Sequence, residues 1–221
     1  MPTNDDNPKD PNAVTPTVTP TVTTPVTTPV TTNAAPVPAL DAERADLLAA
    51  LATARSALTS TVRGLSDERL GERPTASALC LGGLVKHVAA MEEEWMRFVT
   101  DGPSAMRHDL PDGVTWADLM AGTAREIPQW MTDYADGFRM LPGDTLPDIL
   151  ARYERIAARS AEIVAVVPDL SAAHPLPEEP WHEPGRVRSV RGVLMHLIAE
   201  TAQHAGHADI LRETLDGRTA T

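Results

Sequence analysis

The sequence has a single cysteine, Cys80, among its 221 residues. One thiol excludes an internal disulfide, so we expect Cys80 to be a buried free cysteine in a protein of the reducing cytoplasm. No stretch approaches the run of about 20 apolar residues that a membrane-spanning helix needs. Residues 1–10 also lack the basic region and the apolar run of a secretory signal. These absences predict a cytoplasmic protein without a membrane partner.

Basic charge is scarce as well. The chain has 19 Lys and Arg against 31 Asp and Glu, which gives a net charge of −12. Binding to nucleic-acid phosphates needs a basic surface, so this balance argues against a nucleic-acid partner. Dispersed acidic residues mainly promote solubility and say little else about function.

Residues 1–38 differ in composition from the rest of the chain, because they are dominated by Thr, Val and Pro and contain no aromatic residue and no glycine. Recurrent proline removes amide donors and disfavours helix, and such a segment buries little apolar surface. We therefore predict a disordered, extended arm over residues 1–38. The remaining residues, about 180, are enough for one domain with a real core, which we place at 39–217.

Apolar residues in this domain recur at helical spacing, and no segment alternates with the period of two that would predict a strand. A shorter pair of helices is expected within residues 101–143, interrupted at Pro128. Four long amphipathic helices joined by connections of mixed length predict an all-α four-helix bundle without a sheet. The long helices are expected at residues 40–65, 77–100, 145–170 and 189–215.

Several residues carry more local predictions. Asp41 is expected to cap the first helix, and Gly64 and Gly217 to end the first and the fourth. The pair Gly82–Gly83 either permits the close approach of another backbone or marks an irregular helix start. The three glutamates at 92–94 are expected to lie mostly on a solvated helix face.

The fourth helix contains HLIAETAQHAGH, residues 196–207. At about 100° per residue, His196, Glu200, His204 and His207 fall within roughly 80° of one another on the helix surface. The same arc contains Val193 and Leu211, so this polar row lies inside the apolar face. Buried ionisable groups need partners. The row therefore indicates either a metal site or a hydrogen-bonded polar network.

One ion cannot use the whole row, since its two ends are about 16 Å apart along the helix. It can use a neighbouring pair: His196 with Glu200, Glu200 with His204, or His204 with His207. His87, on the apolar face of the second helix, is the candidate third ligand. Such a set suits zinc and also nickel, iron(II) or manganese, and three protein ligands leave a position open for substrate. The remaining histidines of the row would orient the ligands.

Three segments together are similar to a known family. They are LGGLVKHVAAMEEEW, PGDTLPDILARYERIAARS and RSVRGVLMHLIAETAQHAGHADILRETLDG, in this order. The chain resembles the DinB superfamily of helical-bundle proteins over residues 40–217, in particular an actinobacterial-type subgroup of unknown function. The resemblance therefore implies a DinB-like four-helix bundle.

The resemblance also implies a choice among the ligand pairs. In the family, one histidine of the second helix and two residues four apart on the fourth helix bind the metal. These positions correspond to His87, Glu200 and His204, which leaves His196 and His207 as supporting residues. Many relatives have histidine at the position of Glu200, whereas members similar to mycothiol-dependent maleylpyruvate isomerase use a carboxylate there.

The function that the resemblance implies is a metal-dependent S-transferase or isomerase, which uses mycothiol or another low-molecular-weight thiol such as bacillithiol and acts on a small electrophile. One alternative is a metal-binding bundle without turnover, acting as a binding or stress-response module. The other is a structural bundle with hydrogen-bonded histidines. The sequence assigns no catalytic or thiol-binding residue, and it leaves open whether the protein is a homodimer.

Overall fold

The computed structural model describes residues 40–219. The predicted arm, residues 1–38, lies outside the described residues. Within the described range the fold is built on four long helices, which confirms the predicted all-α class and the DinB-like bundle. They are α1 (Ala42–Ser60), α3 (Leu81–Asp101), α6 (Leu146–Val166) and α7 (Val190–Asp216).

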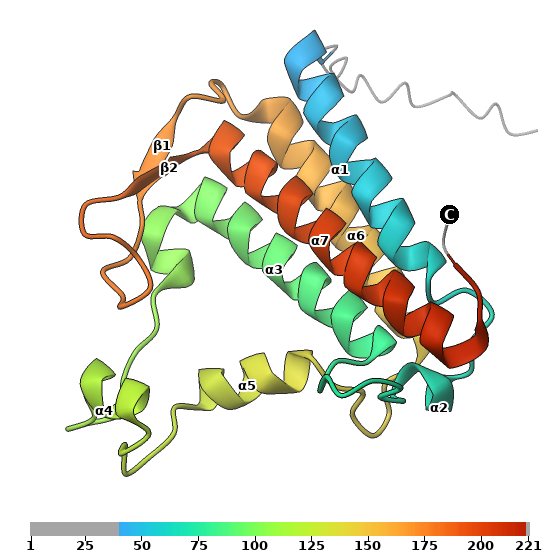
Figure 1. Ribbon diagram of the computed structural model, residues 1–221. Coiled ribbons are helices and arrows are strands. Elements are labelled where there is room, and N and C mark those ends of the chain that lie inside the picture. The colour runs from blue at the N-terminus through green and yellow to red at the C-terminus, as the bar shows by residue number, and fades with distance from the viewer. Residues whose placement is uncertain (1–39, 220–221) are drawn as a thin grey trace, which may run out of the picture. The chain divides into compact units, whose positions relative to one another are not determined.

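The four long helices form a bundle in which α1 and α3 each pack against both α6 and α7. Following the colours of Figure 1 along the chain, α1 and α7 run in one direction and α3 and α6 in the other. Because α3 and α6 are parallel, the connection between them must return along the bundle. That return carries α5, which lies against α3.

Shorter elements occupy the connections: α2 (Asp67–Leu70), the 3₁₀ helix η1 (Gly102–Met106), α4 (Trp116–Ala121), α5 (Gln129–Gly137), β1 (Ala173–Pro175) and β2 (Val187–Ser189). The helix pair α4 and α5 agrees with the sequence, and Pro128 stands at the start of α5. The expectation of no sheet is wrong, because β1 and β2 pair antiparallel with His174 opposite Arg188. Strands of three residues are too short for an alternating pattern to reveal.

The starts of α1, α6 and α7 and the end of α7 agree with the sequence, but α1 ends at Ser60, before the predicted stop at Gly64, and α6 ends at Val166, four residues earlier than predicted. Asp41 caps α1 by accepting a hydrogen bond from the Arg44 amide, and Gly217 ends α7 with a positive φ of 76°. The second helix begins later than expected, at Leu81. In the preceding segment the side chains of Thr75 and Ser77 accept hydrogen bonds from backbone amides two residues on, which favours a turn over a helix.

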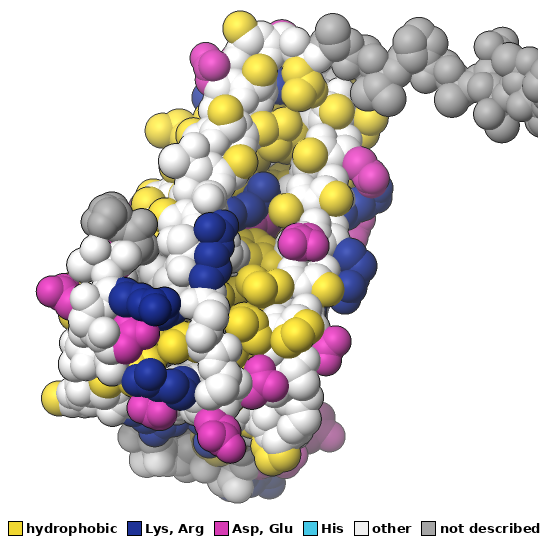
Figure 2. Space-filling view, turned by 90° about the vertical axis from the view of Figure 1, so that its right-hand side faces the viewer, with side chains coloured by type: hydrophobic (Ala, Val, Ile, Leu, Met, Phe, Trp, Pro, Cys, Tyr) yellow, Lys and Arg dark blue, Asp and Glu magenta, His cyan; other side chains and the backbone are white. Residues whose placement is uncertain are grey.

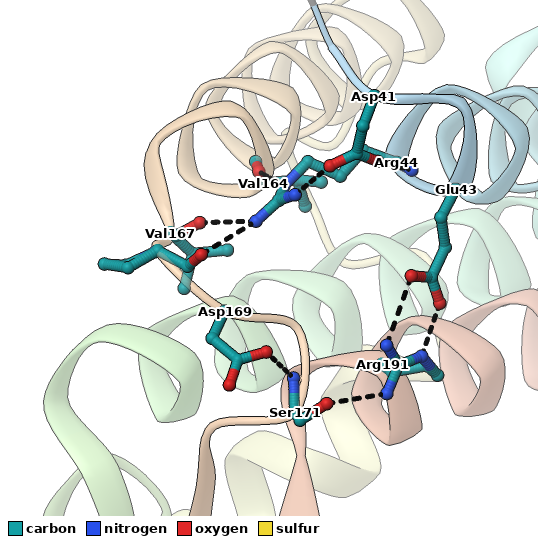
Figure 3. A network of polar contacts seen from close by, with 9 residues as sticks. Asp41, Glu43, Arg44, Val164, Val167, Asp169, Ser171 and Arg191 are labelled. Carbon is teal, nitrogen blue, oxygen red and sulfur yellow. Dashed lines mark hydrogen bonds and ion pairs between the residues drawn. The ribbon is translucent and has the colours of Figure 1, made fainter.

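Arginines hold the helix ends together where α1 and α7 begin and α6 ends (Figure 3). Arg44 on α1 donates to the Val164 carbonyl at 3.0 Å and to the Val167 carbonyl at 2.7 Å. These carbonyls belong to the last turn of α6, which has no helical partner for them. Arg191 on α7 pairs with Glu43 on α1. The contacts fix the mutual position of three helices at this end.

A buried polar layer divides the core into two apolar clusters. Each long helix contributes to it, with Arg55 from α1, Glu92 from α3, Ser160 from α6 and Thr201 from α7. The Glu92 side chain is 0% exposed and accepts hydrogen bonds from Arg55, at 2.8 Å from its Nε, and from the Ser160 hydroxyl. The prediction of a solvated face at 92–94 is therefore wrong for Glu92, which lies four residues after Val88 on the inward face of α3.

Figure 2 shows the side of the bundle turned by 90° from the first view. Hydrophobic side chains line an elongated hollow between two ridges, with cationic side chains within it. No histidine of the described residues is visible on this side, so the histidines lie elsewhere. Within residues 40–219, the helices lack an apolar stretch long enough to span a membrane.

The glycine pair at the start of α3 allows the close approach that the sequence suggested. A β-carbon on Gly83 would overlap the backbone carbonyl of Phe138, and one on Gly82 would overlap the Met140 side chain. The buried Cys80 thiol lies 3.6 Å from the same Phe138 carbonyl oxygen. Because glycine has no side chain at these two positions, the residues that follow α5 can lie directly on α3.

Gly83→Ala is expected to force the backbone at Phe138 away from α3. Because the overlapping atoms belong to the backbone, the fold should lose about 1–3 kcal/mol of unfolding free energy, the usual cost of overpacking. Urea denaturation measures this loss. Gly206→Ala is the control, since Gly206 lies in α7, where an added β-carbon would have nothing within 4 Å. That change should stabilise the protein by about 0.5–1 kcal/mol. Equal effects of the two substitutions would contradict the interpretation.

Candidate metal centre between α3 and α7

The histidine row of α7 lies along its contact with α3. The rings of His204 and His87 meet edge to face with their centroids 5.1 Å apart, and His196 meets Trp95 of α3 in the same way at 5.0 Å. His207 lies beyond His204, with 5.5 Å between ring centroids. The structure thus brings His87 and His204 together across two helices and leaves His196 and His207 on either side.

Glu200 lies between two histidines of the row. Its carboxylate oxygens are 3.8 Å from His196 Nδ1 and 3.9 Å from His204 Nε2. Both distances exceed the length of a hydrogen bond. The Glu200 side chain is 34% exposed and that of His204 is 14% exposed. The carboxylate is therefore near both imidazoles and open to solvent.

Two ring nitrogens of the histidine row lack hydrogen-bond partners among the described residues. Within residues 40–219, Nδ1 of His204 and Nδ1 of His207 are buried without a hydrogen-bond partner. Buried polar atoms without partners are uncommon in folded proteins, and each one calls for an explanation such as an ion or a water. Either an ion or an ordered water would give these two nitrogens a partner.

Two aromatic side chains from the α5 segment cover His87. The Phe138 ring stacks on the imidazole with a centroid distance of 3.9 Å, and the Tyr134 ring meets it edge-on at 5.6 Å. Burial, reinforced by the nearby His204, lowers the pKa of His87 to about 4. Burial also lowers the pKa of His196 and of His204. The three imidazoles are therefore neutral at pH 7, the form in which histidine binds metals.

The outer edge of the site carries a cation and a phenol. The Arg188 guanidinium lies over the Trp95 ring, 4.8 Å from its centroid. The Tyr134 hydroxyl is protonated at pH 7, because partial desolvation and the charge of Glu200 raise its pKa further above the ordinary value of a phenol. Sequence reasoning did not place these residues in the site. Tyr134 belongs to α5, and only the packing of α5 on α3 brings it close to the histidines.

The residues fit a metal ion in chemistry and in the spacing of two ligands. The His87 and His204 centroids are 5.1 Å apart, close to the separation of about 5 Å that zinc–nitrogen bonds of about 2 Å at a tetrahedral angle would give, and also within the ordinary range for rings packed edge to face. The third candidate group, the Glu200 carboxylate, does not converge with the two imidazoles. As the side chains stand in residues 40–219, no three His, Cys, Asp or Glu converge on one point. Glu200 lies 3.8 Å from His196 and 3.9 Å from His204.

Without metal, the fold is expected to lose stability as the pH falls from about 6.5 to 4. Between these values the unfolded chain protonates the imidazole of His87, whereas the folded chain, with a pKa of about 4, excludes the proton. The free energy of unfolding therefore decreases as protons are added. Urea denaturation at several pH values, with a chelator present, measures the change. His87→Leu should flatten this dependence, and an unchanged dependence in that variant would contradict the assignment.

The fold and the site define a class: a DinB-like helical bundle with imidazoles of two neighbouring helices facing each other beside a carboxylate. The sequence matches the Mycothiol-S-transferase family over residues 46–217, and the chain belongs to this family. The resemblance to the DinB superfamily is thereby confirmed. No curated protein sequence matches the chain.

Proposed function

We propose that the protein is a metal-dependent S-transferase that joins a mycothiol-type thiol to a small electrophile. In this proposal His87, Glu200 and His204 hold one divalent ion, with zinc the first candidate and nickel, iron(II) and manganese the others. The observation that carries the proposal is the meeting of the His87 and His204 imidazoles at 5.1 Å beside the Glu200 carboxylate. The family of the chain supports the thiol as substrate.

Binding of the ion needs one local change. The Glu200 carboxylate, already 3.9 Å from His204 Nε2, must turn from His196 towards His204 and His87. The Glu200 side chain is 34% exposed, and its carboxylate accepts no hydrogen bond from either histidine that would hold it in place. A bound ion would also give a partner to one of the buried histidine nitrogens that has none.

A divalent ion would supply one kind of chemistry, since it lowers the pKa of a bound thiol so that the thiolate is present near pH 7. The residues of the chain would do the rest. Neutral imidazoles remain available as ligands because burial lowers their pKa. Arg188, held over Trp95, would pair with an anionic group of a substrate, and Tyr134 would offer a protonated hydroxyl near Glu200.

The test combines mycothiol with chlorodinitrobenzene and the purified protein, supplied in turn with each of the four metals. In the expected reaction a carbon–sulfur bond forms, the carbon–chlorine bond breaks, chloride leaves and the thiol proton passes to solvent. We expect product above the uncatalysed rate, and its loss with a chelator or in Glu200→Ala. Metal binding without thiol consumption with this or other electrophiles would favour the binding module without turnover.

A further inference from the structure

A second candidate site lies on the other side of α3, in a groove between α3 and α6. The groove has a volume of about 560 Å³, which is in the range of small-molecule sites. Its floor is apolar and consists of side chains that are themselves packed into the core, Met96 from α3 and Ile156 and Ile163 from α6. None of the residues of the histidine row lines it.

Four arginines line this groove above the apolar floor. Arg97 comes from α3, and Arg152, Arg155 and Arg159 come from α6. The three on α6 are spaced by three and four residues, so their guanidinium groups are neighbours on one helix face. Like charges at this spacing repel each other.

The acidic residues nearby neutralise only part of this charge. Glu93 pairs with Arg152 at 2.6 Å, and Glu162 pairs with Arg159 at 3.0 Å. Within residues 40–219, Arg97 and Arg155 form no ion pair, although Asp101 also lines the groove and the charge of Arg97 acts on the partly buried Glu94. Two guanidinium groups, one from each helix, are therefore available at the rim.

We infer that this groove binds a small organic carboxylate with a hydrocarbon body. The carboxylate is held between Arg97 and Arg155, because guanidinium groups present paired donors that match a carboxylate. The hydrocarbon body lies on Met96, Ile156 and Ile163, where it is removed from water. The inference is independent of the metal centre, which lies where α3 meets α7.

The test measures binding to the full-length protein by calorimetry, with decanoate as the probe. Decanol tests the hydrocarbon body without the charge, and acetate tests the charge without the body. We expect saturable decanoate binding with a Kd near or below about 1 mM, as a dozen heavy atoms at ordinary ligand efficiency allow. Decanol and acetate should bind much more weakly. No saturable binding of decanoate, or equal binding of decanol, overturns the inference.

Variants locate the bound probe. Arg155→Glu should weaken decanoate binding by at least about tenfold, because it replaces a charged donor with a repelling carboxylate. Arg73→Glu is the matched control, since Arg73 is an exposed arginine outside the groove, and it should leave binding unchanged. Arg97→Gln gives a second, milder measure from the other helix if Arg155→Glu does not fold. Unchanged binding in the folded groove variants overturns the inference.

One further variant separates the two sites. His204→Ala removes a residue of the histidine row, so decanoate should bind to it as it does to the wild-type protein. Loss of binding in this variant would mean that decanoate occupies the metal centre, and the inference of a separate groove site would be wrong. Failure of the transferase assay, by contrast, has no consequence for the groove.

Discussion

His204→Ala is expected to abolish binding of the divalent ion and the thermal stabilisation that the ion provides. A ligand that binds only the folded state adds about 2.7 kcal/mol of stability at 100 times its Kd. If His204 is a ligand, as we propose, its removal should remove this gain and leave the bundle itself folded, since within residues 40–219 its buried Nδ1 has no hydrogen-bond partner and its Nε2 is 3.9 Å from Glu200, beyond hydrogen-bond length. Elemental analysis of the purified protein and melting curves with and without added zinc measure both effects.

His207→Ala is the matched control for this result. It removes the same kind of side chain one helical turn further along α7, where His207 contacts His204 but is beyond the contact of His204 with His87. Loss of a supporting residue should weaken metal affinity by about 10- to 100-fold without abolishing it. Abolished binding in His207→Ala, with binding kept in Glu200→Gln, would mean that the ion uses a different pair of the row.

Arg55→Ala is expected to be the most destabilising of the substitutions considered for the core. Arg55 is the cationic partner of Glu92, whose side chain is 0% exposed. Removal of one partner of a buried ion pair leaves the other charge uncompensated, at a cost of about 3–5 kcal/mol. Urea denaturation of the metal-free protein measures the loss.

The adjacent pair of Glu93 and Arg152 provides a control for this comparison. It also joins α3 to another helix, but its side chains are 48% and 42% exposed. Arg152→Ala should therefore cost no more than about 1 kcal/mol, as for other exposed ion pairs. Similar losses in the two variants would mean that the burial of Glu92 has no energetic consequence.

The candidate metal centre was only partly predictable from the sequence. Helical geometry by itself placed Glu200 and the histidines of α7 on one line, and the apolar neighbours of His87 indicated that it faces inward. Spacing left three ligand pairs open, because all neighbouring residues of the row are three or four apart. The contact that distinguishes His204 is its approach to His87, which depends on the relative shift of α3 and α7 along their axes.

The buried polar layer was missed although its residues follow the apolar spacing. Glu92 lies three residues before Trp95, and Arg55 lies between Leu51 and Leu58 at the same kind of interval. Composition suggested a solvated face, because three consecutive glutamates usually are solvated. The structure contradicts this expectation for Glu92, which is buried and pairs with Arg55 of another helix.

By itself, the sequence determined the class of fold, the four long helices, the caps at Asp41 and Gly217 and the histidine row, since these depend on the local period of the helix and on the conformational preferences of single residues. Only the tertiary structure decided how α5 lies on His87, which side chains of the row approach α3, and where a groove opens between α3 and α6. These features join residues far apart in the chain. They are set by the packing of whole helices, and the spacing of residues along one helix carries no information about the position of its neighbours.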